Sequence, residues 1–100
     1  MKRMVFSSVF EADFAEITLY FAHNTSPEVS ADWEEAVVRL VGLLQKFPEM
    51  GRLRSDLQPP DVRTFVVREF PHYLIFYRLT AAEIFFLRIR HGGMDLTRIL

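Results

Sequence analysis

The chain has 100 residues, no cysteine, a 50% share of apolar residues and a formal net charge of −1. This length suits a single domain over residues 1–100, and the lack of cysteine excludes a disulfide framework and a thiolate metal site. No apolar stretch approaches the roughly 20 residues that span a bilayer, and the N-terminus has no secretory signal, so we expect a cytoplasmic protein with no membrane contact.

Charge is divided unequally between the two halves of the chain. Residues 1–47 hold four basic and seven acidic residues, a net charge of −3, whereas residues 48–100 hold eight basic and six acidic residues, a net charge of +2. All eight basic residues of the second half are arginine, the side chain best suited to bidentate contacts with carboxylates and phosphates. The pattern favours ligand or partner contacts in the second half, although a solvated sheet surface gives the same pattern.

The first half predicts a short strand over 2–6 and then a helix. Ser8 followed by Glu11 forms a capping box that indicates the start of the helix. Apolar residues then recur at helical spacing, which places them on one face: Phe10, Phe14, Ile17 and Phe21. The break at 23–25 ends this helix.

A second helix follows directly. Ser26 is its predicted N-cap, Pro27 its first residue and Glu28 an acid in its first turn. Helical spacing of apolar residues continues for about five turns, until Pro48 and Gly51 end it. Two antiparallel helices joined by so short a turn form a helical hairpin.

The second half changes to the alternation typical of strands. A proline-containing loop covers 48–61, and strands are predicted over 62–67, 73–79 and 84–90. A final turn is predicted to start at Asp95. The order β-α-α-β-β-β predicts an α+β domain in which the helical hairpin packs on one face of a small, mainly antiparallel sheet.

Strict alternation along the last two strands places phenylalanine and arginine together on the sheet face away from the helices. A half-covered antiparallel sheet normally has a polar outer face, so we predict a binding surface here. The residues on this surface are Leu74, Phe76, Arg78, Ile84, Phe86, Arg88 and Arg90.

Motifs for chemistry are sparse. The histidines at 23, 72 and 91 lack metal-ligand spacing, and the chain has no phosphate-binding glycine motif, so no metal or cofactor is expected. One arrangement suits phosphodiester cleavage: His91 as general acid or base, with Arg63 and Arg78 stabilising the charged transition state. The alternative for His91 is a strand-end residue that bonds to a loop backbone.

Several segments, taken in order, resemble a known family. They are the helix from Ser7 to Phe21, Ser26-Pro27, 47–52, Val62-Arg63, 70–78 and 89–96. Together they resemble the ParE branch of the RelE/ParE superfamily, the small toxins of bacterial type II toxin–antitoxin pairs. The resemblance covers nearly the whole chain and implies the same β-α-α-β-β-β fold.

The resemblance implies a cognate, ParD-like antitoxin whose C-terminal segment folds onto the toxin, and no sequence-specific DNA binding by this chain alone. ParE toxins are associated with inhibition of DNA gyrase through protein–protein contact, whereas RelE toxins cleave mRNA on the ribosome. RelE-type nucleases typically carry an arginine at the position of Leu74, lysines at those of Arg52 and Arg54, and a tyrosine in the tail 97–100. Their absence favours a gyrase inhibitor.

Two alternatives stay open. The first is a ribosome-dependent endoribonuclease that uses His91, Arg63 and Arg78. The second is a module that binds an antitoxin without being toxic. Many ParE-like chains have an arginine where this chain has Met94, so an attenuated toxin is consistent with the sequence.

Overall fold

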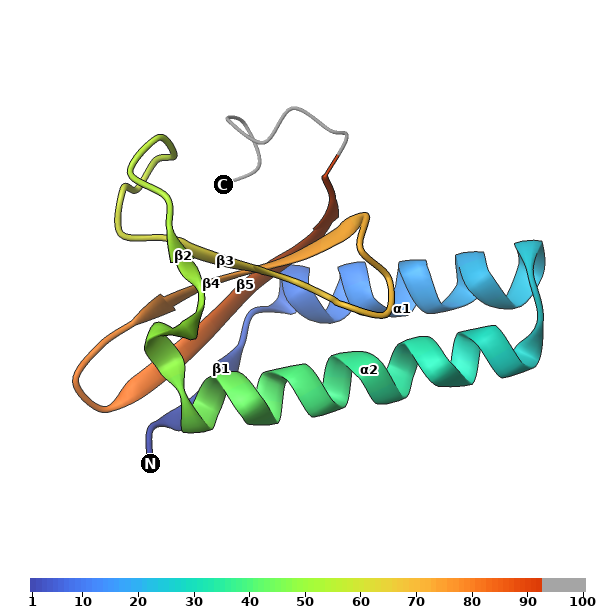
Figure 1. Ribbon diagram of the computed structural model, residues 1–100, viewed down its shortest axis with the longest axis horizontal. Coiled ribbons are helices and arrows are strands. Elements are labelled where there is room, and N and C mark those ends of the chain that lie inside the picture. Colours follow the sequence, from blue (N-terminus) through green and yellow to red (C-terminus); the bar gives the residue numbers. More distant parts are fainter. Residues whose placement is uncertain (93–100) are drawn as a thin grey trace.

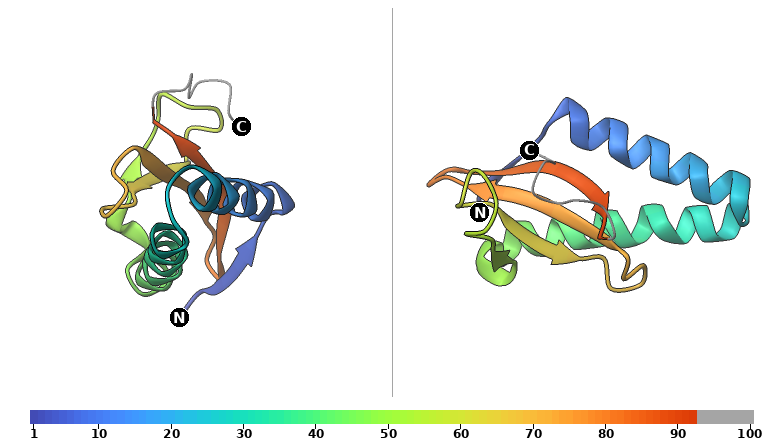
Figure 2. Two further views of the ribbon diagram at one scale, coloured as in Figure 1. Left: turned by 90° about the vertical axis from the view of Figure 1, so that its right-hand side faces the viewer. Right: turned by 90° about the horizontal axis from the view of Figure 1, so that it is seen from above.

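The computed structural model describes residues 1–92 and consists of a sheet with a helical hairpin on one face (Figure 1). The elements are β1 (Arg3–Phe6), α1 (Ser8–Asn24), α2 (Pro27–Lys46), the short 3₁₀ helix η1 (Pro48–Met50), β2 (Arg52–Leu53), β3 (Arg63–Val66), β4 (Tyr73–Leu79) and β5 (Glu83–His91). Figure 2 shows that the far end of the hairpin extends beyond the sheet. The predicted α+β architecture is confirmed, with the two-residue β2 as an addition inside the predicted loop.

The five strands form one sheet in the order β1-β5-β4-β3-β2. The pairs from β2 to β5 are antiparallel, and β1 pairs with β5 in parallel, with Arg3 opposite Glu83 and Phe6 opposite Phe86. The first strand therefore lies beside the last one and forms an edge of the sheet. The Met94 position and the turn predicted at Asp95 lie outside the described residues.

Serine side chains begin both helices. The Ser7 hydroxyl accepts a hydrogen bond from the Phe10 N–H at 2.9 Å, so the N-cap of α1 is Ser7, and the prediction of Ser8 is wrong by one residue. Ser26 caps α2 as predicted, accepting from the Val29 N–H, with Pro27 in the first helical position. No helix among the described residues is both long and apolar enough to cross a membrane.

The main core lies between the hairpin and the sheet. Trp33 of α2 is fully buried and its ring lies 5.0–6.5 Å from four other rings, counted between centroids: Phe14, Phe21, Phe70 and Tyr73. Ile75, Tyr77, Ile84, Phe86 and Ile89 complete the core from the sheet side. A second, smaller core on the opposite sheet face joins Leu57 and Val62 of the loop 54–62 to Phe76.

Tyr77 connects the main core to the end of the helical layer. Its hydroxyl donates to the Pro48 carbonyl at 2.7 Å and accepts from the Gly51 N–H at 2.8 Å. Burial raises the pKa of Tyr77 and keeps the hydroxyl protonated. A Cβ atom at position 51 would overlap this hydroxyl, so the site requires glycine.

We expect Gly51→Ala to destabilise the protein by about 2–3 kcal/mol, because the Tyr77 ring must shift and leave two buried polar groups without their bonds. Denaturant unfolding followed by circular dichroism measures the change. Gly42→Ala is the matched control: a Cβ there meets no atom within 4 Å, and alanine should stabilise α2 by roughly 0.5–1 kcal/mol. Equal effects of the two substitutions would contradict the steric explanation.

Candidate functional site

The predicted Phe/Arg surface is only partly present on the face away from the helices. On β4 the alternation is as predicted, since Leu74 and Phe76 join the second core and Arg78 pairs with Asp61. On β5 the prediction is wrong: Ile84 and Phe86 are fully buried in the main core beneath the helices. Phe76 is also fully buried, under the loop 54–62.

A β-bulge in β5 causes this difference. Tyr77 lies opposite Phe86 and Phe76 lies opposite Arg88, so Leu87 is one extra residue in the ladder. The extra residue reverses the alternation, so that Ile84 and Phe86 before it and Ile89 after it all pack in the main core. Strict period-two patterning cannot reveal a bulge from the sequence.

Arg88 is held by α1 rather than displayed for a partner. Its guanidinium makes a two-pronged ion pair with the Asp13 carboxylate, with Nε to Oδ2 at 2.9 Å and Nη2 to Oδ1 at 3.1 Å. The same carboxylate accepts from the backbone N–H of Ile89 at 3.0 Å. Asp13 thus provides a hydrogen-bond acceptor for the backbone of β5 beyond the point where β1 ends. Its hydrogen bonds to the guanidinium raise the pKa of Arg88.

The sequence contains a signal for this contact that the patterning argument missed. Asp13 falls between Phe10 and Ile17, within the apolar stripe of α1, and Arg88 interrupts an apolar strand. When two apolar faces pack together and each contains one charged residue, and the two charges have opposite signs, a buried ion pair is indicated.

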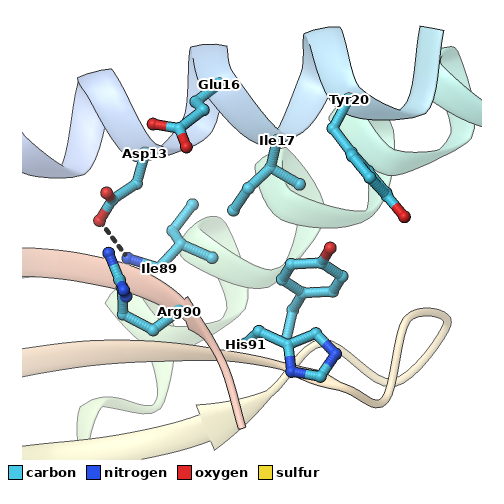
Figure 3. Close-up of a pocket in the computed structure, with 8 residues that line it drawn as sticks. Asp13, Glu16, Ile17, Tyr20, Ile89, Arg90 and His91 are labelled. Carbon is cyan, nitrogen blue, oxygen red and sulfur yellow. Dashed lines mark hydrogen bonds between the residues drawn. The ribbon is translucent and has the colours of Figure 1, made fainter. Parts of the chain in front are cut away.

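A cavity of about 230 Å³ lies beside this ion pair, between α1 and the end of β5 (Figure 3). Its walls combine apolar and polar groups: Asp13, Glu16, Ile17, Tyr20, Tyr73, Ile89, Arg90 and His91. Arg90 lies at this junction and is also the residue of β5 opposite Leu74 of β4. The cavity brings carboxylate, guanidinium, phenol and imidazole groups together.

The three residues of the nuclease alternative do not converge. Arg63 lies opposite Tyr77 and donates to the carbonyls of Gly51 and Glu49, at 2.9 and 3.3 Å. His91 lies opposite Tyr73, four residues further along β4, which corresponds to about 13 Å. Arg78 projects from the other sheet face, where it binds Asp61. The structure thus gives no common phosphate site for these three side chains.

The structure brings together two histidines that no sequence motif connects. The rings of His72 and His91 lie 5.4 Å apart with an angle of 13° between their planes, and Gly92 N–H donates to the His72 carbonyl at 2.6 Å. No group of three or more potential metal ligands occurs within residues 1–92. The pair therefore marks where the ends of β4 and β5 meet.

An apolar groove lies between α1 and α2, next to the end of β1. It has a volume of about 240 Å³, and Glu11 is its one charged wall among apolar residues: Phe6, Phe10, Phe14, Val37, Val38 and Val41. Val38 is 64% exposed although it is a large apolar residue in the middle of α2. An apolar groove with an exposed valine in its lining can accept apolar side chains of a partner.

Two ion pairs stabilise the loop 54–62: one lies within the loop, and the other joins the loop to β4. Arg54 binds both carboxylate oxygens of Asp56, at 2.8–2.9 Å, and Arg78 binds Asp61. The hydrogen bonds from Arg54 lower the pKa of Asp56 to about 2, and those from Arg78 lower the pKa of Asp61. Leu57 and Val62 lie within this loop and cover the second core.

We expect acid to loosen this loop before the main core. The pKa of the Asp56 carboxyl is lower in the folded state than its unfolded value near 3.8. The ionised carboxyl therefore stabilises the folded state at pH values above 3.8, and this contribution is lost as the pH falls toward 2. The amide protection factor of Leu57, whose N–H bonds to Arg54, should therefore fall between pH 4 and pH 2, while that of Leu44 holds. In Asp56→Asn the decrease should be smaller, and an equal decrease would contradict a role for this pair.

Comparison with known proteins gives consistent results over almost the whole chain. Residues 4–96 match the model of the family described as ParE toxin of type II toxin–antitoxin system, parDE. The chain is 29% identical over 96 residues to Toxin ParE3 of Caulobacter vibrioides. The aligned region covers 96% of this chain and 92% of that protein. A solved structure of the chromosomal ParDE toxin–antitoxin system from P. aeruginosa superposes with a TM-score of 0.77 at 24% identity, over 91% of this chain and 96% of that one, and so shares the fold.

The family match covers far more than half of the chain. The resemblance inferred from the sequence is confirmed. This chain belongs to the ParE toxin family of type II toxin–antitoxin systems.

Proposed function

We propose that this chain acts as a toxin that a cognate antitoxin neutralises by docking in the groove between α1 and α2. The observation that carries the proposal is this apolar groove, whose lining includes the exposed side chain of Val38. An amphipathic segment of an antitoxin, disordered when free, can fold into such a groove with its apolar residues as anchors. Leu74, Arg78 and Arg90 stay a prediction for a second antitoxin contact on the sheet.

The proposed target of the free toxin is DNA gyrase, inhibited through protein–protein contact. Membership of the ParE family supports this choice over mRNA cleavage. The separation of Arg63, Arg78 and His91 supports it independently, because cleavage needs an acid, a base and a cation around one phosphate.

The decisive experiment adds the purified chain to gyrase, relaxed plasmid and ATP, and in parallel to a cell-free translation reaction. We expect supercoiling to stop and translation to continue, and we expect premixing with the product of the adjacent antitoxin gene to restore supercoiling. Normal supercoiling with excess toxin would exclude gyrase as the target. Codon-linked mRNA cuts that disappear in His91→Ala would support the nuclease alternative.

A substitution in the groove should separate neutralisation from toxicity. We expect Val38→Glu to weaken antitoxin binding at least tenfold, because complex formation would bury a carboxylate next to Glu11 without a partner. Titration calorimetry with the antitoxin measures this, and growth assays should show a toxin that its antitoxin no longer rescues. Leu53→Glu is the control, since Leu53 is 50% exposed on β2, away from the groove. Equal affinities for Val38→Glu and the unsubstituted chain would contradict the docking site.

A further inference from the structure

Two imidazole rings from different parts of the chain lie side by side at one end of the sheet. His91 is the last residue of β5, and His72 directly precedes β4. Their ring centroids are 5.4 Å apart, and both residues are exposed. An ion in the solvent can therefore reach both rings at once.

The backbone and one ring of this pair are held in place by the surrounding structure. The Gly92 N–H donates to the His72 carbonyl at 2.6 Å, which joins the two chain segments next to the rings. The His91 ring meets the Tyr73 ring edge-on, at 5.3 Å and 84°, and Tyr73 in turn packs against Trp33 of the main core. Two side chains that folding has already brought together lose less entropy when they bind a common ligand.

The separation of the rings suits a single metal ion. A zinc–imidazole bond is about 2.0–2.1 Å long, so two imidazoles on one tetrahedral ion have their ring centroids about 5 Å apart. The observed 5.4 Å is close to this value. Rotation about χ2, which is soft for histidine and which the exposure of both residues permits, turns one nitrogen of each ring toward a common point.

The chemistry of the ligands selects the class of metal. Within residues 1–92 no group of three or more potential ligands occurs, so the described chain offers these two imidazoles. The nearby Asp13 carboxylate already accepts from Arg88 and Ile89, and Figure 3 shows His91 at the opposite end of the cavity from Asp13. Imidazole suits zinc, nickel and copper ions, whereas magnesium and calcium ions prefer oxygen ligands.

We propose that His72 and His91 together bind one divalent transition-metal ion, with water in the remaining coordination positions. Once one imidazole has bound the ion, the other is within bonding reach, so the second bond forms intramolecularly and the pair binds more tightly than either histidine alone. The ion would connect the start of β4 to the end of β5. The site shares no residue with the groove between α1 and α2, so it does not depend on antitoxin docking or on gyrase.

A zinc titration of the complete chain, prepared without a histidine tag and followed by NMR of the histidine ring C–H groups, tests the proposal. We expect the signals of His72 and His91 to shift together along one binding curve. His23 is an internal control, because it is exposed in the last turn of α1 and lies outside the pair. Magnesium should shift none of the three signals. Zinc shifts of equal size at all three histidines, or none at His72 and His91, would overturn the proposal.

Substitutions followed by titration calorimetry give a second test. We expect His72→Ala and His91→Ala each to weaken zinc binding at least tenfold, and the double variant to be little weaker than either single variant, because one substitution already removes the chelate. His23→Ala is the matched control and should bind zinc like the unsubstituted chain. Circular dichroism without metal confirms that the variants are folded. A stoichiometry that merely falls by one ion in each single variant would show two independent histidines and overturn the shared site.

Discussion

Replacement of Asp13 by alanine is expected to remove about 3–5 kcal/mol of stability, a large part of what a small domain possesses. The Asp13 side chain is 9% exposed and binds both the Arg88 guanidinium and the Ile89 N–H. Its loss removes the carboxylate partner of the Arg88 guanidinium, which is 21% exposed. It also removes the acceptor of the Ile89 N–H. Urea unfolding followed by circular dichroism measures the change.

A double-mutant cycle separates the ion pair from the packing around it. Asp13→Leu combined with Arg88→Met replaces both charges by apolar side chains of similar length, and should be less destabilising than Asp13→Leu alone. An additive result would show that the two side chains act independently. It would contradict the view that the contact between α1 and β5 depends on the pair.

Replacement of Trp33 by alanine is expected to cost a similar 3–5 kcal/mol. Its indole is fully buried and contacts rings from α1, from β4 and from the segment before β4, so truncation leaves a large cavity where the two layers meet. The same denaturant titration measures the loss, and the cavity should also increase amide exchange at Ile75 in β4.

Trp33→Phe is the matched control. Within the described residues the indole N–H of Trp33 has no hydrogen-bond partner, so phenylalanine removes ring volume without breaking a bond. We expect a loss of roughly 1–2 kcal/mol for this variant. A loss equal to that of Trp33→Ala would show that the size of the buried ring is not what stabilises the junction.

Most of the helices and strands that the sequence predicts correctly are indicated by signals within a few residues of one another. Ser26-Pro27 identifies the start of α2 because the cap bond and the fixed backbone of proline both act within one turn. The alternation over 73–79 coincides with β4 residue for residue. Membership of the ParE family, inferred from the order of such segments, needed no contact between distant residues.

The errors in the predicted site come from features that depend on two strands at once. The Leu87 bulge exists only in the register between β4 and β5, so Ile84 and Phe86 were assigned to the wrong face. The edge position of β1 and its parallel pairing likewise depend on β5, 80 residues away. The groove formed by Phe6, Phe10 and Val38 required the packing angle of the two helices, which residue spacing does not give.

The pairing of β1 with β5 has a consequence for synthesis of the chain on the ribosome. The helical hairpin can form early, because its contacts are local, but β1 has no strand to bond with until residues 83–86 have left the exit tunnel. The same delay applies to Asp13, whose partners are Arg88 and Ile89. The groove wall at Phe6 is therefore fixed later than the hairpin, so a partner that needs β1 in place can recognise the chain only after residues 83–86 have emerged.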